Sequence, residues 1–235
     1  MIKKFRTMAL AASSILMMGA AVQAADLYTP IPDPVPVYTG GWYFSAFGGA
    51  NWLDNTSFDT NAFGIIDNSY DTGFVVGGAI GYDLGQTMGP FGVRLEAEFS
   101  YRNNDVDDHS VGGAILPNSF GSTSAMAGMG NVLFDLNTGS PFTIYGGGGL
   151  GVANVEFDGH GTNAAGTVMN DDDTVFAWQA IAGVGYEIAP SWVIDVQYRY
   201  FNAGDVSLTE TIGGGNSSST DYESHSVLAG FRVKF

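Results

Sequence analysis

Apolar and polar residues alternate along several stretches of the chain. In the segment WVIDVQYRY (192–200), Trp, Ile, Val and Tyr occupy every second position, with Val, Asp, Gln and Arg between them. A period of two is typical of a β-strand that has one apolar and one polar face. This pattern, or a glycine-rich apolar form of it, predicts eight strands, at about residues 41–53, 73–84, 91–102, 123–135, 142–156, 174–187, 191–201 and 222–235.

The connections between these predicted strands alternate in length. Three are short, with the sequences GQTMGP, LNTGS and EIAPS. The other four are long and polar, at about residues 54–72, 103–122, 157–173 and 202–221. This order predicts an up-and-down antiparallel sheet with short turns at one end and four long loops at the other.

Charged residues gather on one face of the predicted strands. After the first six residues the chain has five Lys or Arg, and each lies at a polar position of a predicted strand, close to carboxylates. The long connections carry acids and no Lys or Arg. The candidate ion network on this polar face is Arg94, Glu96, Glu98, Arg102, Asp195, Arg199, Arg232 and Lys234.

The apolar face carries aromatic residues at both ends of the predicted strands. Those near the short turns are Trp42, Tyr82, Phe134, Tyr186, Trp192 and Phe235, and those near the long loops are Trp52, Phe74, Tyr101, Phe176 and Tyr200. Two aromatic rings around an apolar band are typical of a transmembrane β-barrel, whose apolar face contacts lipid and whose polar face lines the interior. In a soluble sandwich the small residues Ala180, Ala182 and Ala229 would underfill the core. The sequence therefore predicts an all-β, eight-stranded antiparallel up-and-down transmembrane barrel.

The first 39 residues follow other patterns. A basic start is followed by a short apolar run that ends in small residues, which predicts a signal peptide over 1–24 with cleavage between Ala24 and Ala25. A transmembrane anchor is the alternative, but the run is short and is interrupted by two serines. Residues 25–39 are proline-rich and predict an extended periplasmic lead-in, so that the barrel occupies 40–235.

Composition excludes several classes of protein. The chain has no Cys, so neither a disulfide framework nor a thiolate metal site can form. Its net charge is −16, and loss of the predicted signal peptide leaves five basic against 24 acidic residues, a net charge of −19. A chain this acidic is a poor partner for nucleic acid, and we expect none.

Four segments carry a resemblance to a known family: GWYFSAFGGANW, FAWQAIAGVGYEI, WVIDVQYRYFNAGD and the terminal FRVKF. They resemble the eight-stranded outer-membrane barrels of the OmpA-like transmembrane and opacity-type surface-antigen porin family, over about residues 40–235. The resemblance implies a place in the bacterial outer membrane, contact with outer-membrane lipid, and a terminal strand read by the barrel-assembly machinery through Phe231, Val233 and Phe235. It also implies that a peptidoglycan-binding domain, present in longer relatives, is absent after the eighth strand.

Three other patterns are candidate binding or catalytic sites. The acidic segments NNDVDDH (Asp105, Asp107, Asp108, His109) and NDDDT (Asp171, Asp172, Asp173) offer oxygen ligands for Ca²⁺ or Mg²⁺, but neither has EF-hand spacing, so solvated loop tips are expected. The glycines Gly146, Gly148 and Gly151 match G-x-G-x-x-G, but strand-like sequence follows where a nucleotide site needs a helix. His109, His160 and His225 lie in or beside the predicted outer loops and are expected to be exposed.

Two functions are compatible with these features. The interior charges could form a selectivity filter, or a packed ion network that fills a barrel this narrow, and the second is favoured on size. The first hypothesis is a non-enzymatic, cofactor-free outer-membrane barrel with a structural, antigenic or adhesive role, whose loops meet host or other surface ligands. The alternative is a narrow porin or conduit for small solutes.

Overall fold

The computed structural model describes residues 40–60, 64–111, 114–116, 119–162, 166–209 and 217–235. This part of the chain consists of eleven β-strands and connecting turns. The prediction of an all-β fold is confirmed. No helix in the described residues has the length and apolarity needed to cross a bilayer. The predicted signal peptide, its cleavage point at Ala24 and Ala25, and the lead-in lie outside the described residues.

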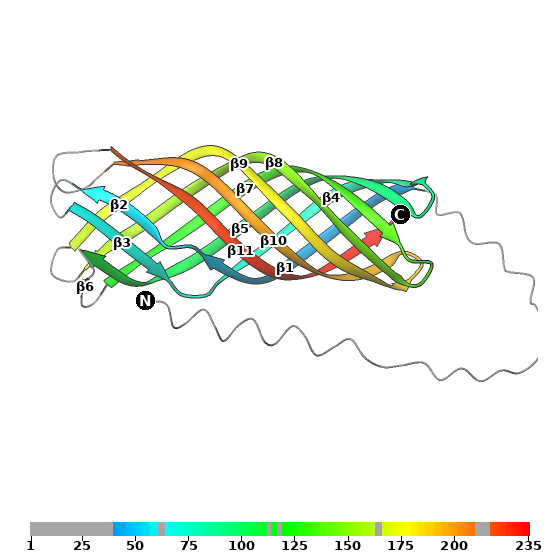
Figure 1. Ribbon diagram of the computed structural model, residues 1–235, viewed down its shortest axis with the longest axis horizontal. Helices are drawn as coiled ribbons and strands as arrows, with labels where there is room; N and C mark the ends of the chain where they lie inside the picture. The colour runs from blue at the N-terminus through cyan, green and yellow to red at the C-terminus, as the bar shows by residue number, and fades with distance from the viewer. Residues whose placement is uncertain (1–39, 61–63, 112–113, 117–118, 163–165, 210–216) are drawn as a thin grey trace, which may run out of the picture. The chain divides into compact units, whose positions relative to one another are not determined.

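Eight strands form a closed ring of antiparallel pairs (Figure 1). In chain order they are β1 (Gly41–Leu53), β4 (Gly73–Met88), β5 (Phe91–Val111), β7 (Ser119–Asn137), β8 (Phe142–Thr162), β9 (Gly166–Ala189), β10 (Trp192–Thr209) and β11 (Ser217–Lys234). Each pairs with the next in this order, and β11 pairs with β1. Closure pairs the outer edges of β1 and β11 with each other, so neither strand has an open edge. A strand in hydrocarbon requires this pairing, because no water is present there to bond its backbone groups.

The strands extend much further than the sequence predicts. The long connections were expected to be loops, but β5, β8 and β10 continue into three of them, and β7, β9 and β11 begin before these three connections end. Three further strands lie there as well: β2 (Thr56–Thr60) and β3 (Gly64–Tyr70) form a hairpin against β5, and β6 (Ala114–Leu116) also pairs with β5. The loop prediction was wrong because polar sequence suggested irregular structure, whereas a polar strand is stable when both edges are paired.

The two faces of the wall differ as the alternation predicts. Large apolar side chains such as Phe44, Leu95 and Val196 are exposed on the outside, and Arg94, Arg102 and Arg199 are among the most deeply buried side chains inside. The aromatic residues near the short turns are exposed outward, including Trp42, Phe134 and Trp192. We call the end of the barrel with the short turns the turn end, and the opposite end the loop end.

Strand β11 completes the ring at the turn end. Phe235 stacks on Phe44 of β1 at a centroid distance of 5.2 Å, and its backbone N–H donates to the carbonyl of Trp42 over 3.0 Å. Phe231 packs against Trp192 of β10 at 4.8 Å. The side chains of Phe231, Val233 and Phe235 therefore follow the outer face, while Arg232 points inward. Their role as an assembly signal stays a prediction.

Candidate functional site: the barrel interior

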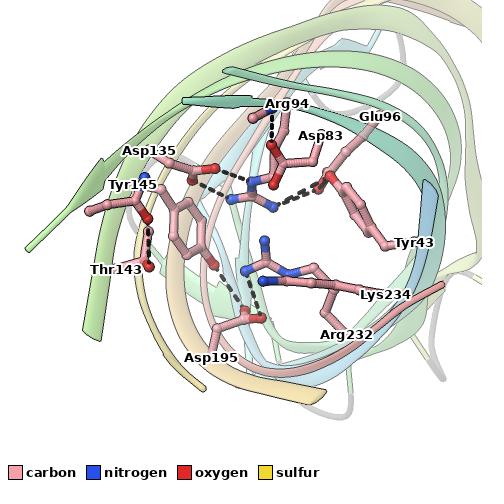
Figure 2. A network of polar contacts seen from close by, with 12 residues as sticks. Tyr43, Asp83, Arg94, Glu96, Asp135, Thr143, Tyr145, Asp195, Arg232 and Lys234 are labelled. Atoms are coloured by element: carbon pink, nitrogen blue, oxygen red, sulfur yellow. Dashed lines mark hydrogen bonds and ion pairs between the residues drawn. The ribbon is translucent and has the colours of Figure 1, made fainter. Parts of the chain in front are cut away.

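The interior at the turn end is centred on Arg94 of β5 (Figure 2). Its Nε and Nη2 donate to the two oxygens of Asp135 on β7, over 2.7 and 2.9 Å, and its Nη1 donates to Glu96 Oε1 over 3.2 Å. Tyr43 of β1 donates its hydroxyl proton to the same Glu96 oxygen over 2.6 Å. Two-pronged pairing of a guanidinium with a carboxylate is the strongest geometry available to this ion pair.

A second pair lies on the other side of the same space. Arg232 of β11 faces Asp195 of β10, with Nη2 and Oδ2 3.9 Å apart, and the Tyr145 hydroxyl donates to Asp195 over 2.9 Å. The rings of Tyr43 and Tyr145 lie within 6 Å of the guanidinium groups of both Arg94 and Arg232. Both tyrosines therefore complete the network as hydrogen-bond donors and as aromatic faces for the cations.

A third group occupies the middle of the interior. Arg199 of β10 forms a short ion pair with Glu98 of β5. The other Glu98 oxygen accepts from Asn131 Nδ2 over 2.8 Å, and Gln179 donates to Asn131 over 2.8 Å. Arg199 also donates through Nε to Gln197 over 3.0 Å. A buried pair of charges is tolerated when such additional hydrogen bonds satisfy the remaining polar atoms.

Two of the predicted network residues do not join these groups. Lys234 pairs with Glu187 at the rim, 3.3 Å apart, where the Glu187 side chain is 43% exposed. Arg102 is fully buried and donates to Ser100 over 3.0 Å, and its guanidinium carbon lies 3.8 Å from the centroid of the Phe201 ring. Its Nε and Nη2 have no hydrogen-bond partner among the described residues.

Sequence reasoning missed several members of the network. Asp135 is the main partner of Arg94, and Asn131, Gln179, Tyr43 and Tyr145 satisfy the remaining charges. The alternation in NVLFDLN places Asn131, Leu133 and Asp135 on one face, so the sequence does carry a signal that these side chains share the inner face. The partners of a charge inside a barrel come from other strands. Alternation shows which side chains of one strand point inward, but it does not give the register between two strands, so it does not identify the partners.

Toward the loop end apolar side chains become more frequent in the interior, although Asn51, Asn104 and Ser226 are buried there and hydrogen-bonded to one another. Along β10 the inward positions change from Asp195, Gln197 and Arg199 to Phe201, Ala203 and Val206. These residues belong to a buried cluster that spans six barrel strands. Its members are Leu53, Ala125, Ala127, Met129, Ala153, Val155, Phe157, Ala177, Phe201, Ala203, Val206 and Tyr222.

The cavities beside the charged groups are small. A cavity of about 20 Å³ lies beside Arg94, Asp195 and Arg199, and one of about 30 Å³ lies at the turn end beside Asp135 and Arg232. A single water needs roughly 10–15 Å³ of such volume, so each of these cavities has room for about one or two waters. Among the described residues, the charged half of the interior is packed.

Two histidines lie buried beyond the apolar cluster, which contradicts the expected exposure of His109 and His160. Both are 3% exposed, and their ring centroids are 5.7 Å apart. His109 bonds through Nδ1 to Asn68 of the β2–β3 hairpin, and His160 bonds through Nε2 to Thr123 over 3.0 Å. Burial lowers the pKa of His109, and burial together with His109 lowers the pKa of His160 to about 4.

The remaining candidate residues lie in strands. Asp105, Asp107 and Asp108 lie on β5 and Asp171–Asp173 on β9, so the expectation of acidic loop tips was wrong. The side chain of Asp172 accepts from Asn154, and that of Asp173 accepts from the backbone N–H of Ser207. In the part of the chain that the structure describes, no three His, Asp or Glu residues are arranged to hold a metal ion. The glycines Gly146, Gly148 and Gly151 lie within β8, while His225 is partly exposed on the outer wall.

Comparison with known proteins identifies the family. Residues 10–235 match the model of the outer membrane protein beta-barrel domain, and the chain belongs to this family, whose place is the bacterial outer membrane. It is 24% identical to an uncharacterized protein of Brucella suis, over 89% of this chain and 82% of that protein. It is 29% identical to the outer membrane protein PagN of Salmonella typhimurium, over 65% of this chain and 66% of PagN.

A solved structure shares the fold. The outer membrane protein OprG from Pseudomonas aeruginosa superposes with a TM-score of 0.51 at 15% identity, over 84% of this chain and 98% of OprG. At this identity the likeness concerns the fold alone. Together with the closed ring of strands and the exposed apolar band, it agrees with a barrel embedded in the outer membrane.

Proposed function

We propose that the protein is a non-conducting, non-enzymatic outer-membrane barrel that spans the membrane and presents its loop end at the cell surface. The observation that carries this proposal is the filled interior: ion pairs occupy the turn-end half, and an apolar cluster occupies the loop-end half. The buried carboxylates Glu98, Asp135 and Asp195 are engaged with cations and hydrogen-bond donors, which leaves them poor general bases.

The surface role is supported by the strand extensions. Outward-facing Asp105, Asp107 and Asp172 lie beyond the aromatic ring near the loop end and are polar, charged and exposed or partly exposed. An even number of barrel strands puts both ends of the barrel sequence on one side, which for a barrel inserted from within is the periplasm. The loop end then faces outward, where its strands are available to host or other surface ligands.

Conductance in planar lipid bilayers tests the proposal. The refolded protein should show no single-channel steps under conditions in which a general porin does. Stable, reproducible steps would favour the alternative, a narrow conduit for small solutes.

Surface labelling tests the orientation separately. An epitope tag inserted after Gly214, between β10 and β11, should be detected on intact cells, whereas a tag after Gly139 in the short turn between β7 and β8 should need permeabilisation. The reverse pattern would overturn the surface role.

A further inference from the structure

Arg102 of β5 differs from the other basic side chains of the barrel. Each of the others lies at most 3.9 Å from a carboxylate oxygen: Arg94, Arg199, Arg232 and Lys234. Arg102 is 0% exposed, and within the described ranges its one hydrogen bond runs from Nη1 to Ser100. A buried charge without a counter-charge is costly, and arginine does not escape this cost by losing its proton.

Unused hydrogen-bond donors gather beside this guanidinium. Four buried atoms have no hydrogen-bond partner in the part of the chain that the structure describes: Arg102 Nε, Arg102 Nη2, the Tyr222 hydroxyl and the Ser224 hydroxyl. Each of these atoms carries a proton that it can donate. A buried donor that finds no acceptor destabilises the folded state, so this group of atoms needs a partner.

The four atoms belong to one layer of the interior, around Phe201 of β10. The guanidinium carbon of Arg102 lies 3.8 Å from the centroid of the Phe201 ring, and that centroid lies 6.0 Å from the centroid of the Tyr222 ring. Ser224 of β11 lies opposite Phe201. The Tyr222 hydroxyl interacts electrostatically with Arg102 and lies beside Ser224, without hydrogen-bond geometry to either. Donors from β5 and β11 therefore meet in this layer.

The polar neighbours of this layer already have partners of their own. Asn51 donates to Asn104 over 2.5 Å and accepts from Ser226 over 2.7 Å. On the inner face of β5, the carboxylate of Glu98 pairs with Arg199. The layer around Phe201 therefore has a surplus of one positive charge and four donor atoms.

Charge and size select the ligand that fits this surplus. Water accepts hydrogen bonds, but it brings no negative charge, and its own protons need acceptors. A divalent anion would leave one negative charge buried in its turn. The side chains opposite Arg102 on β7 and opposite Tyr222 on β10 are the small Ala125 and Ala203. These features favour a small monovalent anion.

We propose that the barrel encloses a small monovalent anion such as chloride, bound by Arg102 together with the hydroxyls of Tyr222 and Ser224. Arg102 supplies the counter-charge and donates through Nε and Nη2, and the two hydroxyls donate from β11. The ion is a structural ligand that joins β5 to β11 across the interior. This inference goes beyond the proposed function and concerns only what completes the interior.

Chloride-linked unfolding tests this proposal. Urea unfolding in detergent is measured at constant ionic strength while sodium gluconate is replaced by sodium chloride. The unfolding equilibrium constant of wild type should fall about tenfold for each tenfold rise in chloride above the dissociation constant, as expected for one ion bound only by the folded state. Little binding elsewhere is expected, because the net charge of −16 repels anions.

Four variants separate the parts of the site. R102M removes the charge and should abolish the chloride dependence. R102K keeps the charge without the guanidinium fork, and Y222F removes one donor, so both should need more chloride for the same effect. K234Q removes a cation that pairs with Glu187 at the rim, and it should respond as wild type does.

Bromide, in place of chloride, locates the ion through its anomalous diffraction. Crystals of wild type grown in bromide should show a peak within hydrogen-bond distance of Arg102 Nε and Nη2. No peak there, or no chloride dependence in wild type, would mean that water or nothing fills this layer and would overturn the proposal. An equal chloride dependence in folded R102M would indicate an adventitious ion only. If R102M does not fold, an unchanged response in both R102K and Y222F would overturn the proposal instead.

Discussion

The two halves of the barrel interior are filled by opposite chemistry. In the turn-end half, Arg94, Arg232 and their carboxylate and tyrosine partners form interlocked ion pairs. In the loop-end half, Phe157, Phe201 and their neighbours form a mainly apolar cluster, with the buried Arg102 guanidinium against the Phe201 ring. Burial of apolar groups is a net gain, whereas burial of paired charges roughly offsets its desolvation cost. The apolar half therefore contributes most of the stability, and the charged half fixes which strands can face each other.

Arg94→Leu should have the largest effect, because it leaves Asp135 buried without its cation. Loss of one partner of a buried ion pair costs about 3–5 kcal/mol in the free energy of unfolding. Urea unfolding in detergent, followed by tryptophan fluorescence, measures this as a lower midpoint with an unchanged slope.

The double variant Arg94→Leu/Asp135→Leu is the matched control. It removes both charges, so much of the lost stability should return. A single Arg94→Leu variant as stable as wild type would mean that Asp135 is hydrated and that the turn-end half is an open pore.

Phe157→Ala tests the apolar half. Phe157 is fully buried, and its truncation should cost about 3 kcal/mol through lost contacts and the cavity left behind. The variant should still not conduct, because the charged half remains filled. Conductance steps in Phe157→Ala would show that the apolar cluster alone closes the interior.

The buried histidines predict that the loop end loosens in acid. The folded-state pKa of His160 is lowered from 6.5 to about 4 and that of His109 is also lowered, so the folded state resists protonation. Their contribution to stability is complete above about pH 6.5 and is lost as the pH falls toward about 4. Asp108, close to His109, opposes this shift but does not reverse it.

Hydrogen exchange monitors this loosening strand by strand. Protection of the β2–β3 hairpin, which contacts His109 through Asn68, should fall between pH 7 and pH 4.5 after correction for intrinsic exchange, while β1 and β11 at the turn end stay protected. In H109Q/H160Q this difference should shrink, because Gln does not titrate in this range. Equal loss of protection at both ends would contradict the assignment to the histidines.

Lys234→Gln should have the smallest effect. Its pairing with Glu187 lies at the rim, and exposed ion pairs contribute about 0–1 kcal/mol. The urea midpoint should therefore stay close to that of wild type, in contrast to Arg94→Leu. A loss as large as that of Arg94→Leu would mean that the charged half extends to the rim.

The sequence predicts the strands of the barrel wall better than the side-chain contacts inside the barrel. Alternation in 192–200 and 222–235 locates wall strands and shows that Arg199 and Arg232 point inward, because the side-chain period of a strand is fixed. It does not show that Arg94 pairs with Asp135, or that His109 meets His160, because these contacts depend on the register between separate strands. Residues 103–111 are polar and were therefore predicted to be a loop, whereas β5 extends through them.

Cysteine accessibility tests the central claim, that both halves of the interior are filled, most directly. The chain has no Cys, so Ala79→Cys, opposite Glu98 in the charged half, and Ala127→Cys in the apolar cluster each introduce a single thiol. Both native residues are at most 8% exposed, whereas Ser140 in the turn between β7 and β8 is exposed and serves as the control. The account predicts that a small, charged methanethiosulfonate reagent modifies Ser140→Cys within seconds to minutes and leaves the other two thiols unmodified in the folded protein. Modification of Ala79→Cys or Ala127→Cys at the rate of Ser140→Cys would show a water-filled lumen and would contradict the account.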